Sequence, residues 1–268
     1  MTHLDWSALG SSVHAAIEQK TGTVRSVRTV SDGMNSHIAL VLDAVGGAFF
    51  VKGVDATSHL IKPQDREAMI GPYVSSVSPR LRHRVRADRW DLLIFDALAG
   101  ARSADYSPGS DDLPKVVEVI HRLAAIPCPD LPIKQAEQRW AEHIDNPANR
   151  MLLRGDRLLH TDFNPLNILL NEDDTWIVDW AWPTRGAGFI DPACFLIRLI
   201  TCGHTAAEAE QWAARCPGWN DAEPLALDVF AAANQRLFQE ISDQARDSLW
   251  KAELAKAATL WAAHRGVA

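Results

Sequence analysis

Short runs of alternating apolar and polar residues dominate the first third of the chain. Residues 24–53 contain three such runs, VRSVRTV, HIALVLD and GAFFVKG, separated by the turn-forming segments SDGMNS and AVGG. Alternation of this length between turn formers predicts three antiparallel β-strands joined as a meander. Two further runs, RLRHRVRA and WDLLIFD within residues 80–96, predict two more strands.

Helical spacing of apolar residues precedes, interrupts and follows these strands. Residues 4–20 predict an amphipathic helix that stops at Gly22, and Pro63 marks the first turn of a short helix that ends at Gly71-Pro72. Beyond Gly100 the pattern becomes mostly helical. Helices are expected over residues 110–126, from Lys134 to Asn146, and repeatedly from Asp191 onward.

One β-like segment, residues 158–180, lies among these later helices. The order of elements therefore predicts an α+β protein with two lobes: a small antiparallel sheet and a larger, mostly helical part. We expect the first lobe to span residues 1–96 and the second residues 97–268, with the join near Phe95–Gly100.

Four arginines alternate along one expected strand, at positions Arg80, Arg82, Arg84 and Arg86. Alternate residues of a strand point to the same face. We interpret this row as a solvent-exposed strand face in preference to a dedicated anion site.

Charge is unevenly distributed along the chain. The formal net charge is −7; residues 1–100 carry 11 Lys and Arg against 10 Asp and Glu, whereas residues 101–268 carry 16 against 24. This balance argues against a nucleic-acid partner, which requires a basic surface. An acidic helical part is compatible with a cationic small substrate, and equally with a solubilising surface.

The remaining composition narrows the class of protein further. No apolar run approaches the length needed to span a bilayer, and the N-terminal residues do not have the pattern of a secretory signal. The four cysteines fit no zinc or redox motif, so we expect reduced thiols in a cytoplasmic protein.

Candidate chemistry is concentrated in the segment 158–180. It contains His160-x-Asp162-x4-Asn167, followed by a second apolar run that ends in Asp179. Phosphoryl transfer requires a carboxylate to orient and deprotonate an acceptor hydroxyl, and oxygen ligands for Mg²⁺ ions that bridge the phosphates. Asp162 suits the first role, and Asn167 and Asp179 suit the second.

These residues resemble the aminoglycoside phosphotransferase-like and choline kinase-type small-molecule kinases, relatives of the protein kinases. Lys52, in FFVKG, lies where this family keeps its ATP lysine, and Glu67 suits its lysine-pairing glutamate. The stretch LLIFDALAG resembles the family's connector, where backbone groups around Asp96 and Leu98 would meet adenine. Asp191, in GFIDPA, lies where relatives carry an aspartate that braces the catalytic loop. The resemblance implies ATP and Mg²⁺ as cofactors.

Two departures from protein kinases refine this interpretation. The segment Asp179-Trp180-Ala181 replaces Asp-Phe-Gly, which favours the small-molecule branch. The phosphate-covering loop contains only Gly33 where protein kinases have a glycine-rich motif, although its backbone amides and the Ser36 hydroxyl are candidates for phosphate contacts.

The acceptor is predicted from charge and from the family. The acidic helical part favours an amine-bearing sugar, antibiotic or amino alcohol as the acceptor. The sequence leaves open whether the biological role is resistance, biosynthesis or catabolism. The candidate residues that line the acceptor site are Trp182, Trp140, Glu137 and Asp228. Core packing is the competing explanation for both tryptophans. Three alternative functions remain: a kinase of a neutral hydroxylated molecule, a nucleotide-binding pseudokinase without turnover, and a protein kinase.

Overall fold

The protein divides into two compact units. The computed structural model describes residues 3–30, 36–245 and 247–268. The first unit, here called the sheet unit, comprises Met1–Arg102 with Asn171–Ala181, and the second, the helical unit, comprises Ser103–Leu170 with Trp182–Ala268. A β-sheet part and a mostly helical part therefore both form, which confirms the predicted fold class.

A five-stranded sheet forms the centre of the described sheet unit. Neighbouring strands are antiparallel and follow the order β1-β2-β3-β5-β4, so the meander and the two added strands are confirmed. The strands are β1 (Val24–Thr29), β2 (Ile38–Ala44), β3 (Gly47–Asp55), β4 (Leu81–Ala87) and β5 (Trp90–Asp96).

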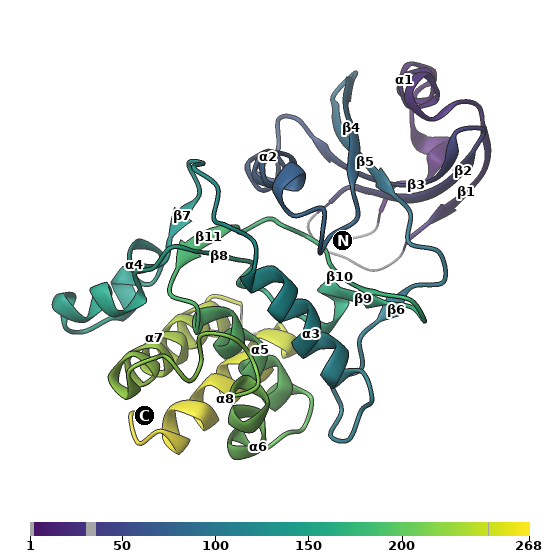
Figure 1. The fold of residues 1–268 in the computed structure, drawn as a ribbon. Coiled ribbons are helices and arrows are strands. Elements are labelled where there is room, and N and C mark those ends of the chain that lie inside the picture. The colour runs from purple at the N-terminus through teal and green to yellow at the C-terminus, as the bar shows by residue number, and fades with distance from the viewer. Residues whose placement is uncertain (1–2, 31–35, 246) are drawn as a thin grey trace. The chain divides into compact units, whose positions relative to one another are not determined.

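Helix α1 (Ser11–Thr21) covers one face of this sheet (Figure 1). Its buried Val13 and Ile17 belong to the same apolar cluster as Val51 and Leu92 of the sheet. The expected helix over residues 4–20 is only partly present, because Gly10 adopts an extended conformation and begins α1 as its N-cap. The preceding residues form instead the short 3₁₀ helix η1 (Trp6–Ala8).

Helix α2 (Ile61–Ile70) lies on the opposite face of the sheet. Consecutive strand residues point to opposite faces, and Lys52, next to Val51, contacts Glu67 of α2. Pro63 occupies the first turn as predicted, and the helix ends at Ile70, before the 3₁₀ helix η2 (Gly71–Tyr73).

The segment 171–181 belongs to the sheet unit although it follows much of the helical unit in the chain. It contains β10 (Thr175–Ile177), and the Ile177 N–H donates to the Val77 carbonyl at 2.7 Å. The expected boundary at residue 96 therefore describes only part of the division. Local sequence patterns do not reveal that a short later strand returns to the first unit.

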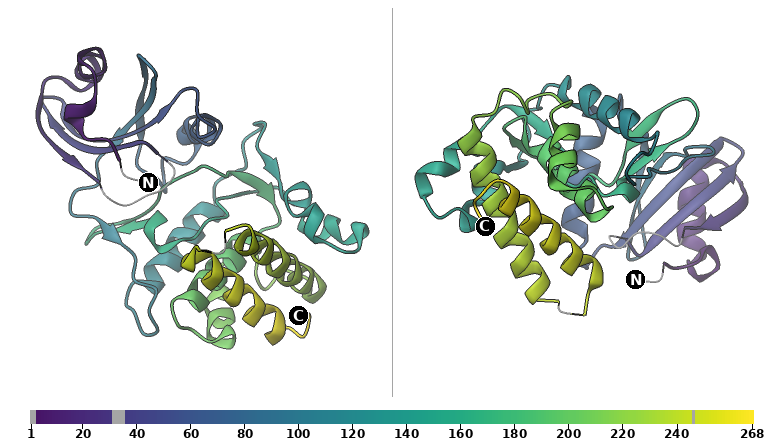
Figure 2. Two further views of the ribbon diagram at one scale, coloured as in Figure 1. Left: turned by 180° about the vertical axis from the view of Figure 1, so that it is seen from behind. Right: turned by 90° about the horizontal axis from the view of Figure 1, so that it is seen from below.

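The helical unit is built from α3 and a group of C-terminal helices. Helix α3 (Leu113–Ala124) has the predicted apolar stripe, and α7 and α8 pack side by side (Figure 2). The C-terminal helices are α5 (Ile190–Thr201), α6 (Ala206–Ala213), α7 (Pro224–Asp243) and α8 (Leu249–His264). Among residues 3–30, 36–245 and 247–268, no helix is both long and apolar enough to cross a membrane.

Short strands and turns connect α3 to α5. A three-stranded sheet of order β7-β11-β8 joins β7 (Lys134–Gln135), β11 (Thr184–Gly186) and β8 (Arg157–Leu159). The predicted helix from Lys134 to Asn146 is wrong, because residues 134–135 pair with β11 and leave a single helical turn. The other short elements are β6 (Arg102–Ser103), α4 (Ala136–Arg139), η3 (Ala141–His143), η4 (Pro147–Leu153), η5 (Pro165–Asn167) and β9 (Ile168–Leu170).

Candidate active site

In the sheet unit, a buried lysine is held between two carboxylates. Lys52 lies on β3, and its Nζ donates to Glu67 Oε2 at 2.8 Å and to Asp179 Oδ1 at 2.6 Å. The Lys52 and Glu67 side chains are 10% and 7% exposed, and that of Asp179 is 20% exposed. Three residues distant in the sequence thus form one charged cluster, which we call the Lys52 cluster.

The protonation of this cluster follows from burial and charge. Burial alone would lower the pKa of Lys52, but the nearby charges of Asp179 and Glu67 outweigh it and raise that pKa. Burial raises the pKa of Glu67, and the Lys52 charge offsets only part of that effect. Lys52 is therefore a permanent cation inside the unit, with a geometry fixed by its two acceptors.

The chain after Asp179 is attached to α2. Asp179 adopts a left-handed conformation with φ of 63°, an uncommon region for a residue other than glycine. The backbone of Trp180 forms a hydrogen bond with Glu67, and Arg66 Nε donates to the Ala181 carbonyl at 2.7 Å. Helix α2 therefore positions both Lys52 and the segment that carries Asp179.

In the helical unit, Asp191 braces the loop that carries Asp162. The His160 and Thr161 amides donate to Asp191 Oδ2 and Oδ1 at 2.9 and 2.8 Å, and Thr161 has a φ of 68°. Burial raises the pKa of Asp191 to about 7 against the opposing effect of these two hydrogen bonds. Asp191, the first acidic residue of α5, thus orients the turn before Asp162.

Two side chains orient the Asp162 carboxylate. Arg198 donates to Oδ1 at 2.8 Å from α5, and Asn167 Nδ2 donates to Oδ2 at 3.1 Å and to the Asp162 carbonyl at 3.2 Å. Because the amide nitrogen of Asn167 faces Asp162, its oxygen is the atom left to act as a metal ligand. The carboxylate is 31% exposed, so an acceptor can reach it.

Solved structures of small-molecule kinases have the same fold over nearly the whole chain. Choline kinase LicA from Streptococcus pneumoniae superposes with a TM-score of 0.61 and 12% identity, over 95% of this chain and 100% of that one. A choline/ethanolamine kinase family protein from Mesorhizobium loti gives 0.61 and 14%, over 95% and 96%. A thermostable mutant of the aminoglycoside phosphotransferase APH(4)-Ia, in ternary complex with AMP-PNP and hygromycin B, gives 0.60 and 16%, over 96% and 99%.

The chain has the fold of these small-molecule kinases. The resemblance that the sequence motifs indicated is thereby confirmed for the fold. No protein-family model matches the chain. A search of curated proteins also gives no significant match to its sequence.

This kinase-like fold gives a context for the expected Mg²⁺ ligands. An amide oxygen from Asn167 and a carboxylate from Asp179 are hard oxygen donors, the type that Mg²⁺ takes together with phosphate oxygens and water. Each side chain is held by hydrogen bonds within its own unit. Each of the two side chains is therefore, taken by itself, a suitable donor for the cation.

The residues predicted to meet the nucleotide elsewhere are placed as follows. The Asp96 N–H donates to the Arg80 carbonyl at 3.0 Å, so this amide already has a hydrogen-bond partner within the sheet unit. Leu98 lies just beyond the end of β5. Ser36 is buried, and its Oγ lies 3.3 Å from His3 Nε2. Its contact with phosphate stays a prediction. Gly33 lies outside the described residues.

The four candidate acceptor residues have different surroundings. Trp140 is buried against Phe230 at a ring-centroid distance of 5.1 Å, so core packing describes it better than substrate contact. Asp228 accepts from Arg265 Nε at 2.6 Å. Oε2 of Glu137 is buried and has no hydrogen-bond partner within the described part of the chain. Trp182 is exposed.

Basic side chains surround Trp182 and the turn before Asp162. Lys134 Nζ lies 4.8 Å from the centre of the Trp182 ring, and the Arg139 guanidinium carbon lies 5.6 Å from it. Arg139 also donates to the hydroxyl oxygens of Thr161 and Thr184. Trp182 therefore lies beside two cationic side chains, although the unit as a whole is acidic.

Sequence reasoning missed Arg198 and Arg139. Arg198 follows Asp191 by seven residues, so the two share one face of α5, and that spacing was a usable signal. Arg139 lies in a segment that was predicted as a longer helix.

The helical unit also contains a cavity of about 530 Å³ beside Leu158, Phe189 and Asp221. Neither Asp162 nor the four candidate acceptor residues are among the described residues that line it.

Proposed function

We propose that the chain is an ATP-dependent small-molecule kinase that transfers the γ-phosphoryl group to a hydroxyl group. The observation that carries the proposal is the Lys52 cluster: a buried cation between two carboxylates, on the third strand of a chain with the kinase-like fold. A buried charge is costly to maintain, and an apolar side chain at the same position would avoid that cost. A role in binding anionic phosphates therefore explains why a cation is present.

Each residue has a role that its contacts support. Lys52 would hold phosphate oxygens of the nucleotide while Glu67 fixes the lysine, and Asp179 and Asn167 would each offer an oxygen ligand to Mg²⁺. When bound, Mg²⁺ neutralises charge on the phosphate oxygens. Structures of LicA with AMP and of APH(4)-Ia with AMP-PNP agree with a nucleotide as the first substrate.

Asp162 acts on the acceptor in this proposal. Its carboxylate accepts the hydroxyl proton as the acceptor oxygen forms a bond to the γ-phosphorus, and the bond from that phosphorus to the β–γ bridging oxygen breaks to release ADP. Arg198 and Asn167 fix the orientation of the carboxylate, which favours placement over base strength as the main contribution.

Two acceptor classes are supported by different observations. The acidic balance of residues 101–268 favours an amine-bearing sugar, antibiotic or amino alcohol, the class we propose first. Lys134 and Arg139 beside Trp182 favour a neutral or anionic hydroxylated acceptor as the second candidate. The two classes differ in charge, so one panel of acceptors separates them.

The test is ADP release by the full chain with Mg-ATP against pooled amine-bearing, neutral and anionic alcohols. Asp162→Asn is expected to lower kcat by about 10²–10⁴ while changing nucleotide affinity little. Asp156→Asn, at an exposed position of the helical unit, is the matched control. Nucleotide binding without transfer to any acceptor would favour a pseudokinase. Equal loss of nucleotide affinity in Asp162→Asn would contradict the role given to this residue.

A further inference from the structure

A second charged cluster lies on the same face of the sheet as Lys52. Lys52 of β3 pairs in register with Leu93 of β5, and Leu93 pairs with Arg84 of β4. Asp91 and Arg86 are two residues away from Leu93 and Arg84, so all these side chains point to the face that α2 covers. The row of arginines is therefore not simply a solvent-exposed face.

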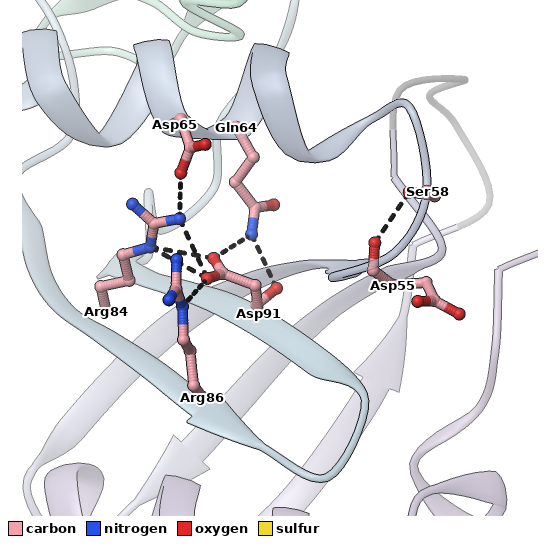
Figure 3. Close-up of polar contacts among 7 residues, drawn as sticks. All are labelled: Asp55, Ser58, Gln64, Asp65, Arg84, Arg86 and Asp91. Atoms are coloured by element: carbon pink, nitrogen blue, oxygen red, sulfur yellow. Dashed lines mark hydrogen bonds and ion pairs between the residues drawn. The ribbon is translucent and has the colours of Figure 1, made fainter.

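Asp91 is the centre of this cluster (Figure 3). It is fully buried, and its carboxylate accepts from Arg84 Nε at 3.0 and 3.1 Å and from Arg86 Nε at 2.6 Å. Burial alone would raise the pKa of Asp91, but hydrogen bonds from Arg84, Arg86 and Gln64 outweigh it and lower that pKa. A buried carboxylate thus remains charged because three donors surround it.

Helix α2 supplies one of these donors. Gln64 Nε2 donates at 2.7 Å to both Oδ1 and the backbone carbonyl of Asp91, and the neighbouring Asp65 accepts from Arg84. Gln64 and Glu67 are three residues apart, so they lie on one face of the helix. One of them contacts β5 and the other contacts Lys52 on β3.

The chain that leads into α2 is also fixed. Asp55, the last residue of β3, is buried, and its side chain accepts from the Thr57 N–H at 2.8 Å and the Thr57 hydroxyl at 2.7 Å. Its backbone carbonyl accepts from Ser58 Oγ at 2.8 Å (Figure 3). The turn before α2 is therefore fixed by Asp55, and α2 itself is held at its middle by Gln64.

We propose that Asp91 is a positioning residue for phosphoryl transfer: through Gln64 and Arg84 it anchors α2 so that Glu67 meets Lys52. The inference rests on the proposed function for its catalytic consequence. The anchoring of α2 can be measured independently of any activity.

The test exchanges the charged and neutral partners. Gln64→Glu places a second carboxylate against Asp91 at nearly unchanged volume, and we expect α2 to separate from β5. The double variant Gln64→Glu/Asp91→Asn exchanges the amide and the carboxylate between the two positions and should restore the hydrogen bond between the two side chains, whereas the bond to the backbone carbonyl of residue 91 stays lost. Asp88→Asn is the matched control, because Asp88 accepts a hydrogen bond from Ser12 of α1, the helix on the opposite face of the sheet from α2.

Two measurements are made on the full chain. Hydrogen exchange of the amides in residues 61–70 and acetylation of the Lys52 amine should both accelerate at least about fivefold in Gln64→Glu. Both should return toward wild type in the double variant and stay unchanged in Asp88→Asn. The kcat/KM for ATP should fall about tenfold in Gln64→Glu. When Glu67→Gln is already present, adding Gln64→Glu should lower kcat/KM by less than about twofold, because both substitutions act through the Glu67–Lys52 contact.

The outcomes separate the inference from the proposed function. Unchanged exchange of α2 and unchanged Lys52 acetylation in Gln64→Glu would overturn the inference, as would full additivity with Glu67→Gln. A wild-type chain that binds no nucleotide would instead refute the proposed function. In that case the exchange and acetylation measurements still decide whether Asp91 anchors α2.

Discussion

Replacing Lys52 with methionine removes the ammonium group shared by Glu67 and Asp179 while keeping an unbranched side chain of similar length. Two carboxylates then remain at a buried position without their common cation. At an effective dielectric constant of about 20, a pair of unit charges 2.8 Å apart interacts by about 6 kcal/mol. Desolvation of the ammonium cancels much of this, and breaking a buried ion pair typically costs about 3–5 kcal/mol.

The cost should depend on pH, because Glu67 can become neutral. Burial raises the pKa of Glu67, and Lys52 opposes that shift, so the pKa rises further in Lys52→Met. A carboxyl group whose pKa is higher in the folded than in the unfolded chain loses stability as the pH rises between the two values. We therefore expect a destabilisation of about 3–5 kcal/mol near about pH 8 and a clearly smaller one near about pH 5.

The assay is urea unfolding of the full chain at both pH values, followed by tryptophan fluorescence and circular dichroism. Lys62→Met is the matched control, because Lys62 is exposed on α2, and its effect should remain within about 0.5 kcal/mol. If Lys52→Met lost the same stability at both pH values, Glu67 would not be the group that compensates. If it lost none, the Lys52 cluster would not be a buried ion pair in solution.

Two further predictions concern the helical unit. Because burial raises the pKa of Asp191 to about 7, wild-type stability should fall between about pH 4 and about pH 7 by up to about 4 kcal/mol, and urea unfolding of Asp191→Asn should show a flatter profile. Arg198→Gln removes a charge-assisted hydrogen bond to Asp162 and should lower kcat about tenfold to a hundredfold without weakening nucleotide binding. Steady-state kinetics and a nucleotide titration check this, and a rise in nucleotide Kd equal to the loss in kcat would contradict it.

Much of the sheet unit could be predicted because its strands are marked locally. Alternating residues and the turn formers around Gly46 and Gly47 fix the strand limits, and antiparallel pairing follows from the short turns. The Lys52–Glu67 contact could be anticipated only through the family resemblance, and the Lys52–Asp179 contact was not predicted. Nothing in the spacing of 15 residues, or of 127, indicates a contact by itself.

The segment from Lys134 to Asn146 shows where local patterns are insufficient. Its composition suits a helix, yet Lys134 and Gln135 pair with Thr184 and Arg185, about fifty residues further along the chain. A parallel strand pair of two residues leaves no periodic signal in the sequence. The same limitation placed Trp140 among candidate acceptor residues, because burial against Phe230 depends on a helix that begins more than eighty residues later.

The arginine row on β4 shows a different limitation, which concerns charge more than fold. Alternation correctly placed Arg84 and Arg86 on one face, but it could not distinguish a face in water from one that covers a buried carboxylate. Asp91 stands inside the apolar run WDLLIFD, where a fully buried aspartate is expensive unless several donors surround it. An acid next to the apolar centre of a buried strand, two residues from the position paired with an arginine, is therefore itself a signal. It indicates a buried polar contact with donors on a neighbouring element.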